Sequence, residues 1–170
     1  MDTYRAIVTK RDTRNFAPRP IPGDILDRIL QAGRMAGSSK NSQPVRLVVI
    51  RDEERLAEIA ACGQFAKHMP SAALAIAVVL EPGGGAFDAG RAAQNMMVAA
   101  WAEGITSCPT SMHDAGCART TLGAPEGHSV AILLPMGYPA EGTSLHGGRA
   151  RLPLDDYVHW DRWPSGDTTA

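Results

Sequence analysis

Residues 37–44 read Gly-Ser-Ser-Lys-Asn-Ser-Gln-Pro, a polar stretch between the apolar pattern of a helix and that of a strand. A loop of this composition offers hydroxyls, amides and backbone N–H groups to a polar ligand, and Pro44 fixes the direction in which the chain leaves it. Alone, such a stretch is as often an ordinary polar turn. Only the rest of the chain can distinguish a binding loop from a turn.

Two cationic clusters accompany this loop, one near each end of the chain. The first is Lys10-Arg11-Asp12-Thr13-Arg14-Asn15, and the second contains Arg149 and Arg151. Guanidinium groups bind phosphate through paired hydrogen bonds, although an isolated cluster of this kind is usually solvated surface charge. Taken with the loop, the clusters indicate a phosphorylated, ring-bearing cofactor.

The composition is that of one ordinary folded domain. The chain has 170 residues, of which 44% are hydrophobic and 21% charged, and its net charge is −1. This balance is unlike that of a disordered or membrane protein, and it gives no bulk attraction to nucleic acid. The longest apolar run, residues 72–80, is too short to span a bilayer, and residues 1–5 lack the apolar core of a signal peptide. We therefore expect a cytoplasmic protein that binds neither membranes nor nucleic acid.

The three cysteines, Cys62, Cys108 and Cys117, are too few and too scattered for a disulfide framework, so we expect reduced thiols. The spacing Cys108-x4-His113-x3-Cys117 lacks the tight cysteine pair with which zinc sites usually begin. We therefore predict no metal site.

Apolar periodicity and turn residues predict alternating helices and strands without an internal repeat or a linker. Asp24 is expected to cap a helix that Gly37 ends. The other predicted helices are 2–9, 53–61, 88–103 and 114–122, and the predicted strands are 45–51, 72–80, 105–108 and 129–134.

Two segments point to a partner. The helix at 88–103 is apolar nearly all round, so it is expected at the centre of the fold or in a subunit interface. The tail from residue 141 lacks periodicity but keeps Leu152, Leu154, Tyr157, Trp160 and Trp163. Such a tail either packs back on its own domain or wraps a partner subunit. We expect one domain over 1–164, including this arm, and a disordered end over 165–170.

Four segments, in this order, resemble motifs of the FMN-dependent nitroreductase family. Residues 10–16 resemble its R-R-S-x-R-x-F opening, and residues 38–44 its S-x-x-N-x-Q-P-W loop. Residues 135–139, Pro-Met-Gly-Tyr-Pro, resemble its late G-Y-P element, and residues 149–153 its K/R-x-R-x-P segment. The helix at 88–103 with Gly104 resembles the family's central helix. No single motif is specific, but their common order is.

The resemblance implies an α+β fold, with a mostly antiparallel sheet flanked by helices, in an intertwined homodimer. FMN would lie at the dimer interface, with the serine–asparagine loop of one subunit facing the arginines of the other. NAD(P)H would reduce the flavin, and a nitroaromatic- or quinone-like acceptor would reoxidise it by a ping-pong mechanism.

The expected FMN contacts follow from the matched motifs and from their chemistry. Because the cofactor performs the hydride chemistry, we expect no catalytic side chain. Gly137 would let the backbone approach the flavin ring, and Lys67 would stabilise negative charge on the reduced ring. The complete expected set is Lys10, Arg11, Asp12, Arg14, Ser38, Ser39, Asn41, Gln43, Gln64, Lys67, Gly137, Arg149 and Arg151.

Three features depart from the family pattern. Asp12 stands where the family has a serine, so its carboxylate would accept from ribityl hydroxyls or orient Arg11 or Arg14. Val45 replaces a tryptophan, which removes a large wall. The chain is also short for the family and lacks the insertion that often covers the substrate.

Two other functions remain open at this point. One is a flavin-binding carrier or sensor without turnover. The other is a relative specialised for a different flavin reaction, although such relatives generally carry extra substrate-binding segments. A nucleotide-phosphate scaffold is weaker, since the chain has neither G-x-x-x-x-G-K-[ST] nor a strand-coupled G-x-G-x-x-G.

Overall fold

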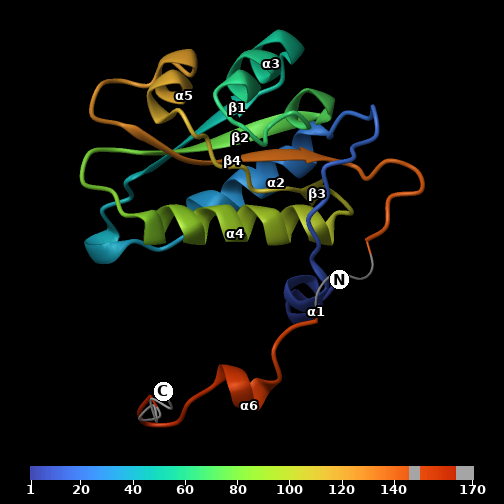
Figure 1. Cartoon of the computed structure of the whole chain (residues 1–170), viewed down its shortest axis with the longest axis vertical. Helices are drawn as coiled ribbons and strands as arrows, with labels where there is room; N and C mark the ends of the chain where they lie inside the picture. Colours follow the sequence, from blue (N-terminus) through green and yellow to red (C-terminus); the bar gives the residue numbers. More distant parts are fainter. Residues whose placement is uncertain (146–149, 164–170) are drawn as a thin grey trace, which may run out of the picture.

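A computed structural model describes residues 1–145 and 150–163 (Figure 1). The helices are α1 (Thr3–Thr9), α2 (Gly23–Arg34), α3 (Glu53–Ala61), α4 (Ala86–Ala102), α5 (Ala115–Thr121) and α6 (Leu154–Tyr157), with 3₁₀ turns η1 (Ser39–Asn41) and η2 (Met69–Ser71). The strands are β1 (Val45–Ile50), β2 (Leu74–Leu80), β3 (Thr106–Ser107) and β4 (Ser129–Gly137).

The four strands form one antiparallel sheet in the order β1-β2-β4-β3, with helices on both faces. Side chains of β2 alternate between two apolar cores, as the period of a strand requires. Leu74, Ile76 and Val78 pack in the core on the α2 and α4 side, and Ala75 and Ala77 in the core on the α3 and α5 side. The expected antiparallel α+β architecture is confirmed, and β2 is buried on both faces.

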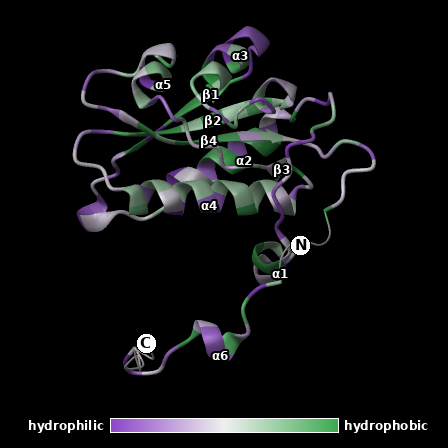
Figure 2. Ribbon diagram, in the orientation of Figure 1, coloured by the Kyte–Doolittle hydropathy of each residue, from purple (hydrophilic) through white to green (hydrophobic). Residues whose placement is uncertain are grey.

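The central helix α4 packs one face against the sheet and α2. A Cβ on Gly33 of α2 would lie 2.8 Å from Met96, so glycine allows these two helices to approach closely. The opposite face of α4 is exposed and carries Phe87, Arg91 and Gln94. The expected central position is therefore confirmed for the face that packs on the sheet and α2, and the opposite face is open in a single copy (Figure 2).

Local sequence patterns predicted some helix and strand boundaries correctly and others incorrectly. Asp52 caps α3 by accepting from the Arg55 N–H, and α3 occupies its predicted range. In α2, however, Pro22 takes the N-cap position and Asp24 lies inside the first turn, so the predicted cap is wrong. The same helix ends at Arg34, before Gly37, and β4 extends to Gly137 rather than ending at 134.

The prediction of reduced cysteines is also wrong for two of the three. Cys62 and Cys117 form a disulfide that joins the end of α3 to α5, with their Cα atoms 5.6 Å apart. Cys108 is free and buried. No local pattern indicated this pair, because the two residues are 55 positions apart and meet through the packing of α3 and α5.

The described part of the tail does not pack back on the domain. It leads away from the body and ends beyond α6 (Figure 1). Its large apolar side chains are exposed, from 67% at Leu152 to 83% at Trp160. Residues 165–170, expected to be disordered, lie outside the described residues. No helix among the described residues is long and apolar enough to cross a membrane.

Candidate functional site

The N-terminal basic segment runs along the edge of the sheet formed by β3. Asp12 pairs with Ser107 in an isolated parallel bridge, and the Thr13 N–H donates to the Ser107 carbonyl over 3.2 Å. Beyond β3 the chain stays beside β4, because the Thr110 N–H donates to the Leu133 carbonyl over 2.8 Å. Two segments far apart in the sequence, 10–14 and 107–110, therefore lie side by side.

Lys10 and Asp12 form an ion pair on this edge. The Lys10 side chain is only 11% exposed, and its Nζ donates to Asp12 Oδ1 and lies 3.5 Å from Met97 Sδ of α4. The carboxylate thus orients Lys10, whereas we expected it to orient Arg11 or Arg14. Arg11 points elsewhere, since its Nη1 donates to the Val8 and Lys10 carbonyls.

Ser107 and Cys108, which we call the floor of the site, are buried beside this ion pair. Ser107 is 1% exposed, and its Oγ has no hydrogen-bond partner among the described residues. A buried hydroxyl without a partner is costly, so it marks a place where a polar ligand group would be stabilised. Burial raises the pKa of the neighbouring Cys108 thiol, and the positive charge of Arg14 partly offsets this.

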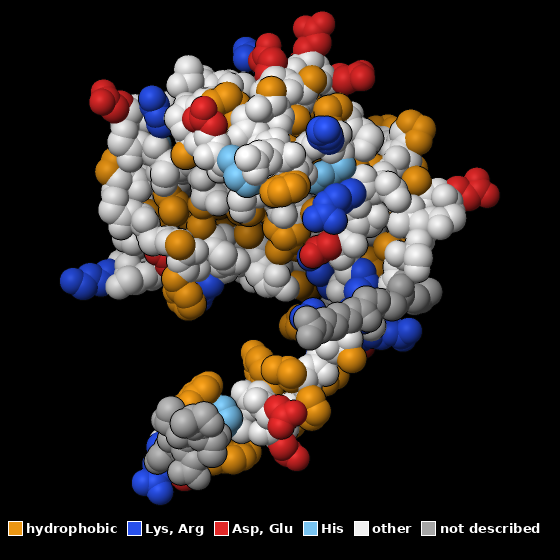
Figure 3. Space-filling view, viewed as in Figure 1, with side chains coloured by type: hydrophobic (Ala, Val, Ile, Leu, Met, Phe, Trp, Pro, Cys, Tyr) orange, Lys and Arg blue, Asp and Glu red, His pale blue; other side chains and the backbone are white. Residues whose placement is uncertain are grey.

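A third segment forms the wall of the same site. His68 Nε2 lies 3.2 Å from Thr110 Oγ1, and burial together with Arg14 lowers the pKa of His68. The charge of Arg14 therefore influences the pKa values of both His68 and Cys108. Gln64 and Lys67, two expected contacts, precede His68 in the same segment; both are exposed, and Gln64 lines a separate hollow with Cys62 and His113. Lys, Arg and His side chains gather on this face of the molecule (Figure 3).

The serine–asparagine loop lies at the other end of α4. Lys40, Asn41 and Gln43 have positive φ angles of 51°, 54° and 49°, and the Gln43 N–H donates to Ser38 Oγ over 2.8 Å. Ser38, Ser39, Asn41 and Gln43 thus form a tight turn beyond the first residues of α4, whereas the basic segment passes its last turns (Figure 1). Within one chain the two groups are not brought together.

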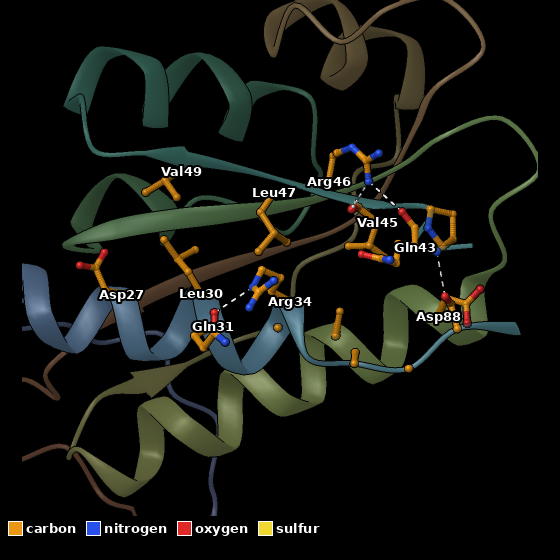
Figure 4. Close-up of a pocket in the computed structure, with 16 residues that line it drawn as sticks. Asp27, Leu30, Gln31, Arg34, Gln43, Val45, Arg46, Leu47, Val49 and Asp88 are labelled. Atoms are coloured by element: carbon orange, nitrogen blue, oxygen red, sulfur yellow. Dashed lines mark hydrogen bonds between the residues drawn. The ribbon is translucent and has the colours of Figure 1, made fainter. Parts of the chain in front are cut away.

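A hollow of about 620 Å³ lies elsewhere in the molecule, between α2 and the edge strand β1. Leu30, Val45, Leu47 and Val49 line it with apolar surface, and Gln43 closes one end (Figure 4). No charged cluster with an unpartnered buried group accompanies it among the residues that the structure describes. We therefore place the candidate site at the β3 edge.

Two further expected contacts, Gly137 and Arg151, do not reach this site within one copy. The space at Gly137 is filled by Phe16, since an added Cβ would lie 3.0 Å from the Phe16 ring, so this glycine serves packing. Arg151 is exposed in the tail, away from the body. Arg149 lies outside the described residues.

The structure adds Ser107, Thr110 and His68, which sequence reasoning did not select. A signal for the first two existed in the polar residues in and just after the predicted strand at 105–108, where Ser107 lies inside the strand and Thr110 follows it. Nothing local distinguished His68, because its partner is 42 residues away. Among the described residues, no three His, Cys, Asp or Glu side chains are placed to hold a metal ion.

Comparison with known proteins identifies the family of this chain. The sequence model described as "Nitroreductase family" matches residues 7–80 and 81–138. An NADH dehydrogenase of Thermus thermophilus is 29% identical over 94% of this chain and 96% of its own length. An NADPH-flavin oxidoreductase of Vibrio harveyi is 26% identical, covering 95% of this chain and 75% of its own.

Solved structures show the same fold. Nitroreductase A of Vibrio parahaemolyticus superposes with a TM-score of 0.88 at 25% identity, over 98% of this chain and 79% of its own. The NADPH:FMN oxidoreductase of Vibrio harveyi, solved with NAD+, gives a TM-score of 0.87 at 25% identity, over 97% and 79% of the two chains.

Proposed function

The chain belongs to the nitroreductase family, and from this premise we propose that it passes electrons from NAD(P)H through FMN to small acceptors of the nitroaromatic or quinone class. It is an NAD(P)H-dependent flavin oxidoreductase, as its relatives' names indicate. FMN, when bound, supplies the ring that takes up a hydride and delivers it to the acceptor. The protein's own task is to bind, orient and polarise.

The observation that carries this proposal is the buried polar edge at β3. The Lys10–Asp12 pair, Arg14 and the unpartnered Ser107 Oγ converge there. Positive charge suits a phosphate or an electron-rich ring, and a hydroxyl with free hydrogen-bonding capacity suits a ribityl chain. These residues therefore fit FMN, with Lys67 and Gln64 adding a cation and an amide from the wall.

The site is completed by a second copy of the chain in this proposal. α4 has 17 residues and is therefore about 25 Å long, with the basic segment near one end and the 38–43 loop at the other. In a homodimer, the loop of one copy would face the basic segment of its partner. The exposed tail would carry Arg149 and Arg151 onto the partner, where the apolar hollow beside β1 is open to such an arm.

No side chain of the β3 edge is proposed as an acid or base. Lys10 is paired, and burial keeps the Cys108 thiol protonated at neutral pH by raising its pKa. The residues at this edge therefore set geometry and electrostatics. Because one site would serve both the nicotinamide and the acceptor, we propose a ping-pong mechanism. With valine at position 45 and a short chain, we also expect a permissive acceptor pocket.

The visible spectrum of purified protein, before and after addition of FMN, tests cofactor binding. A flavin absorbance that remains after desalting supports the proposal, and its absence contradicts it. Anaerobic NADH or NADPH should then bleach the bound flavin, and a nitroaromatic or quinone should restore the colour.

Initial rates at varied NAD(P)H and acceptor concentrations test the mechanism. Parallel lines in double-reciprocal plots are expected, and intersecting lines would exclude a ping-pong order. A yellow protein that NAD(P)H does not bleach would instead be a flavin carrier.

A further inference from the structure

Two segments on the α3 and α5 side of the sheet are fastened to each other along their length. We call residues 62–68 the wall loop and residues 110–117 the facing segment. The Cys62–Cys117 disulfide joins them at one end, and the Asp114 N–H donates to the Cys62 carbonyl over 3.1 Å. Met112 of the facing segment packs beside Gly63. Two further contacts involve histidines, one at each end of the stretch that carries Gln64 and Lys67.

His113 holds the first half of the wall loop. Its Nδ1 accepts from the Gln64 backbone N–H over 3.2 Å, so the proton of the neutral ring is on Nε2. Its ring also meets the exposed Phe65 ring edge-on, with centroids 5.4 Å apart. Both contacts hold residues 64 and 65 of the wall loop in place.

His68 holds the other end of the wall loop. Thr110 Oγ1 donates to the Cys108 carbonyl over 2.9 Å, so its own proton is engaged. The Thr110 oxygen can then accept from His68 Nε2, which lies 3.2 Å away. This bond fastens the residue next to Lys67 to the chain segment that forms the floor of the site.

Apart from these contacts, the wall loop is held at its two ends, where the Gly63 N–H donates to the Ala60 carbonyl and the Met69 N–H to the Ala66 carbonyl. Between α3 and η2 it has no helix or strand, and of residues 63–67 only Ala66 is buried. A loop that is ordered before the ligand arrives does not pay the cost of ordering on binding. The affinity of the site for its ligand therefore depends on the contacts that hold the wall loop in place, which we call its tethers.

We propose that His68 and His113 are positioning residues that hold the wall loop so that Gln64 and Lys67 face the same site as Lys10 and Arg14. The inference rests on the proposed function, since it assigns these residues a role toward FMN. They do not act on the cofactor directly, but through the backbone of the wall loop.

Paired substitutions of each histidine test the proposal. His113→Asn keeps an acceptor at the position of Nδ1, and His68→Gln keeps a donor at the position of Nε2, whereas His113→Leu and His68→Leu remove them. FMN affinity is measured by fluorescence titration of each apoprotein, and amide hydrogen exchange is measured over residues 62–68. Each leucine variant should bind FMN about two- to tenfold more weakly and exchange faster in the wall loop, and its polar counterpart should restore both.

His128→Leu is the matched control, because His128 lies in the turn before β4, outside both segments. It should bind FMN as the parent protein does. Equal affinity of the leucine variants and the parent would overturn the proposal, and so would failure of the polar variants to recover. If a leucine variant does not fold, the alanine variant of the same histidine, which also removes the ring nitrogen, takes its place in the comparison. A parent protein that binds no FMN would instead contradict the proposed function, while the exchange data would still report on the tethers.

Discussion

At the scale of single residues, Asp12 is where this chain differs most from its family's pattern. Its carboxylate neutralises Lys10, a cation whose side chain is only 11% exposed. The pair is a stable resting arrangement, but it lowers the positive charge available to a phosphate or to an electron-rich ring.

We therefore predict that Asp12→Ser binds FMN more tightly than the parent protein, by about three- to tenfold at low salt. The gain should shrink as salt is added, because screening weakens the contribution of the freed Lys10. Titration of the apoproteins at two ionic strengths measures this. Weaker binding by the variant would instead mean that the carboxylate accepts hydrogen bonds from the cofactor.

Arg14 and Arg11 form a natural pair for comparison. Arg14 acts on both wall and floor of the site, whereas Arg11 donates to the backbone carbonyls of Val8 and Lys10. Losing a charged hydrogen-bond donor costs about 1.5–3 kcal/mol, so Arg14→Ala should weaken FMN binding by roughly tenfold or more. Arg11→Ala should change the dissociation constant by less than about twofold. A larger effect at Arg11 would show that its side chain turns toward the cofactor.

His68 and Cys108 predict how stability depends on pH. The pKa of His68 is lowered from 6.5, so below that pH the unfolded chain takes up a proton that the folded chain resists, and stability falls. The pKa of Cys108 is raised from 9.0, so above that pH the unfolded chain loses its proton first, and stability falls again.

Urea midpoints between about pH 5 and 10 should therefore show losses on both sides of a plateau. His68→Gln should flatten the acid side and Cys108→Ala the alkaline side. Unchanged slopes in these variants would mean that other groups cause the losses.

At the scale of elements, sequence patterns were reliable wherever local chemistry decides. α3 was predicted to the residue because Asp52 caps it and its apolar stripe has helical spacing. β2 was recognised as doubly buried from its continuous apolar run. The cap of α2 was misplaced because Pro22 already fixes the backbone at that position, and the end of β4 because Pro135 looked like a terminator inside a strand.

The link between α3 and α5 depends on contacts that no local pattern encodes. A disulfide closing a segment of this length stabilises by about 2–4 kcal/mol, so reduction of Cys62–Cys117 should lower the melting temperature by roughly 5–15 °C. The Cys62→Ala, Cys117→Ala double variant should not respond to the reductant.

Thiol counting checks the same pair directly. The denatured, unreduced chain should show the single thiol of Cys108, and reduction should expose the other two. Three thiols before reduction would contradict the disulfide.

At the scale of the whole molecule, the candidate site was predicted as separate pieces. Each motif supplied candidate residue types, but their placement depends on the path of the chain around α4. That path brings Lys10 and Arg14 to the β3 edge and leaves Ser38 and Asn41 at the far end of the helix. A sequence pattern read along one chain cannot tell whether separated groups meet within it or between two copies.

The exposed tail predicts how two copies would be held together. Trp160 is 83% exposed and Leu154 72%, so neither contributes to packing within its own domain. Burying such an arm on a partner would give an interface above about 2,000 Å², for which no folded monomer is expected at micromolar concentration. Sedimentation should therefore detect a dimer, and a folded species of 18.1 kDa would contradict this.

Trp160→Ser separates the two possible roles of the tail. Because this side chain is exposed within one copy, the substitution should leave the far-ultraviolet circular dichroism of the domain unchanged. Buried tryptophans are frequent hot spots of interfaces, so it should weaken dimerisation by roughly tenfold or more. FMN affinity should fall in parallel, because in the proposed dimer the same arm would bring Arg151 to the partner. A variant that dimerises and binds FMN like the parent protein would show that the arm has no part in assembling the site.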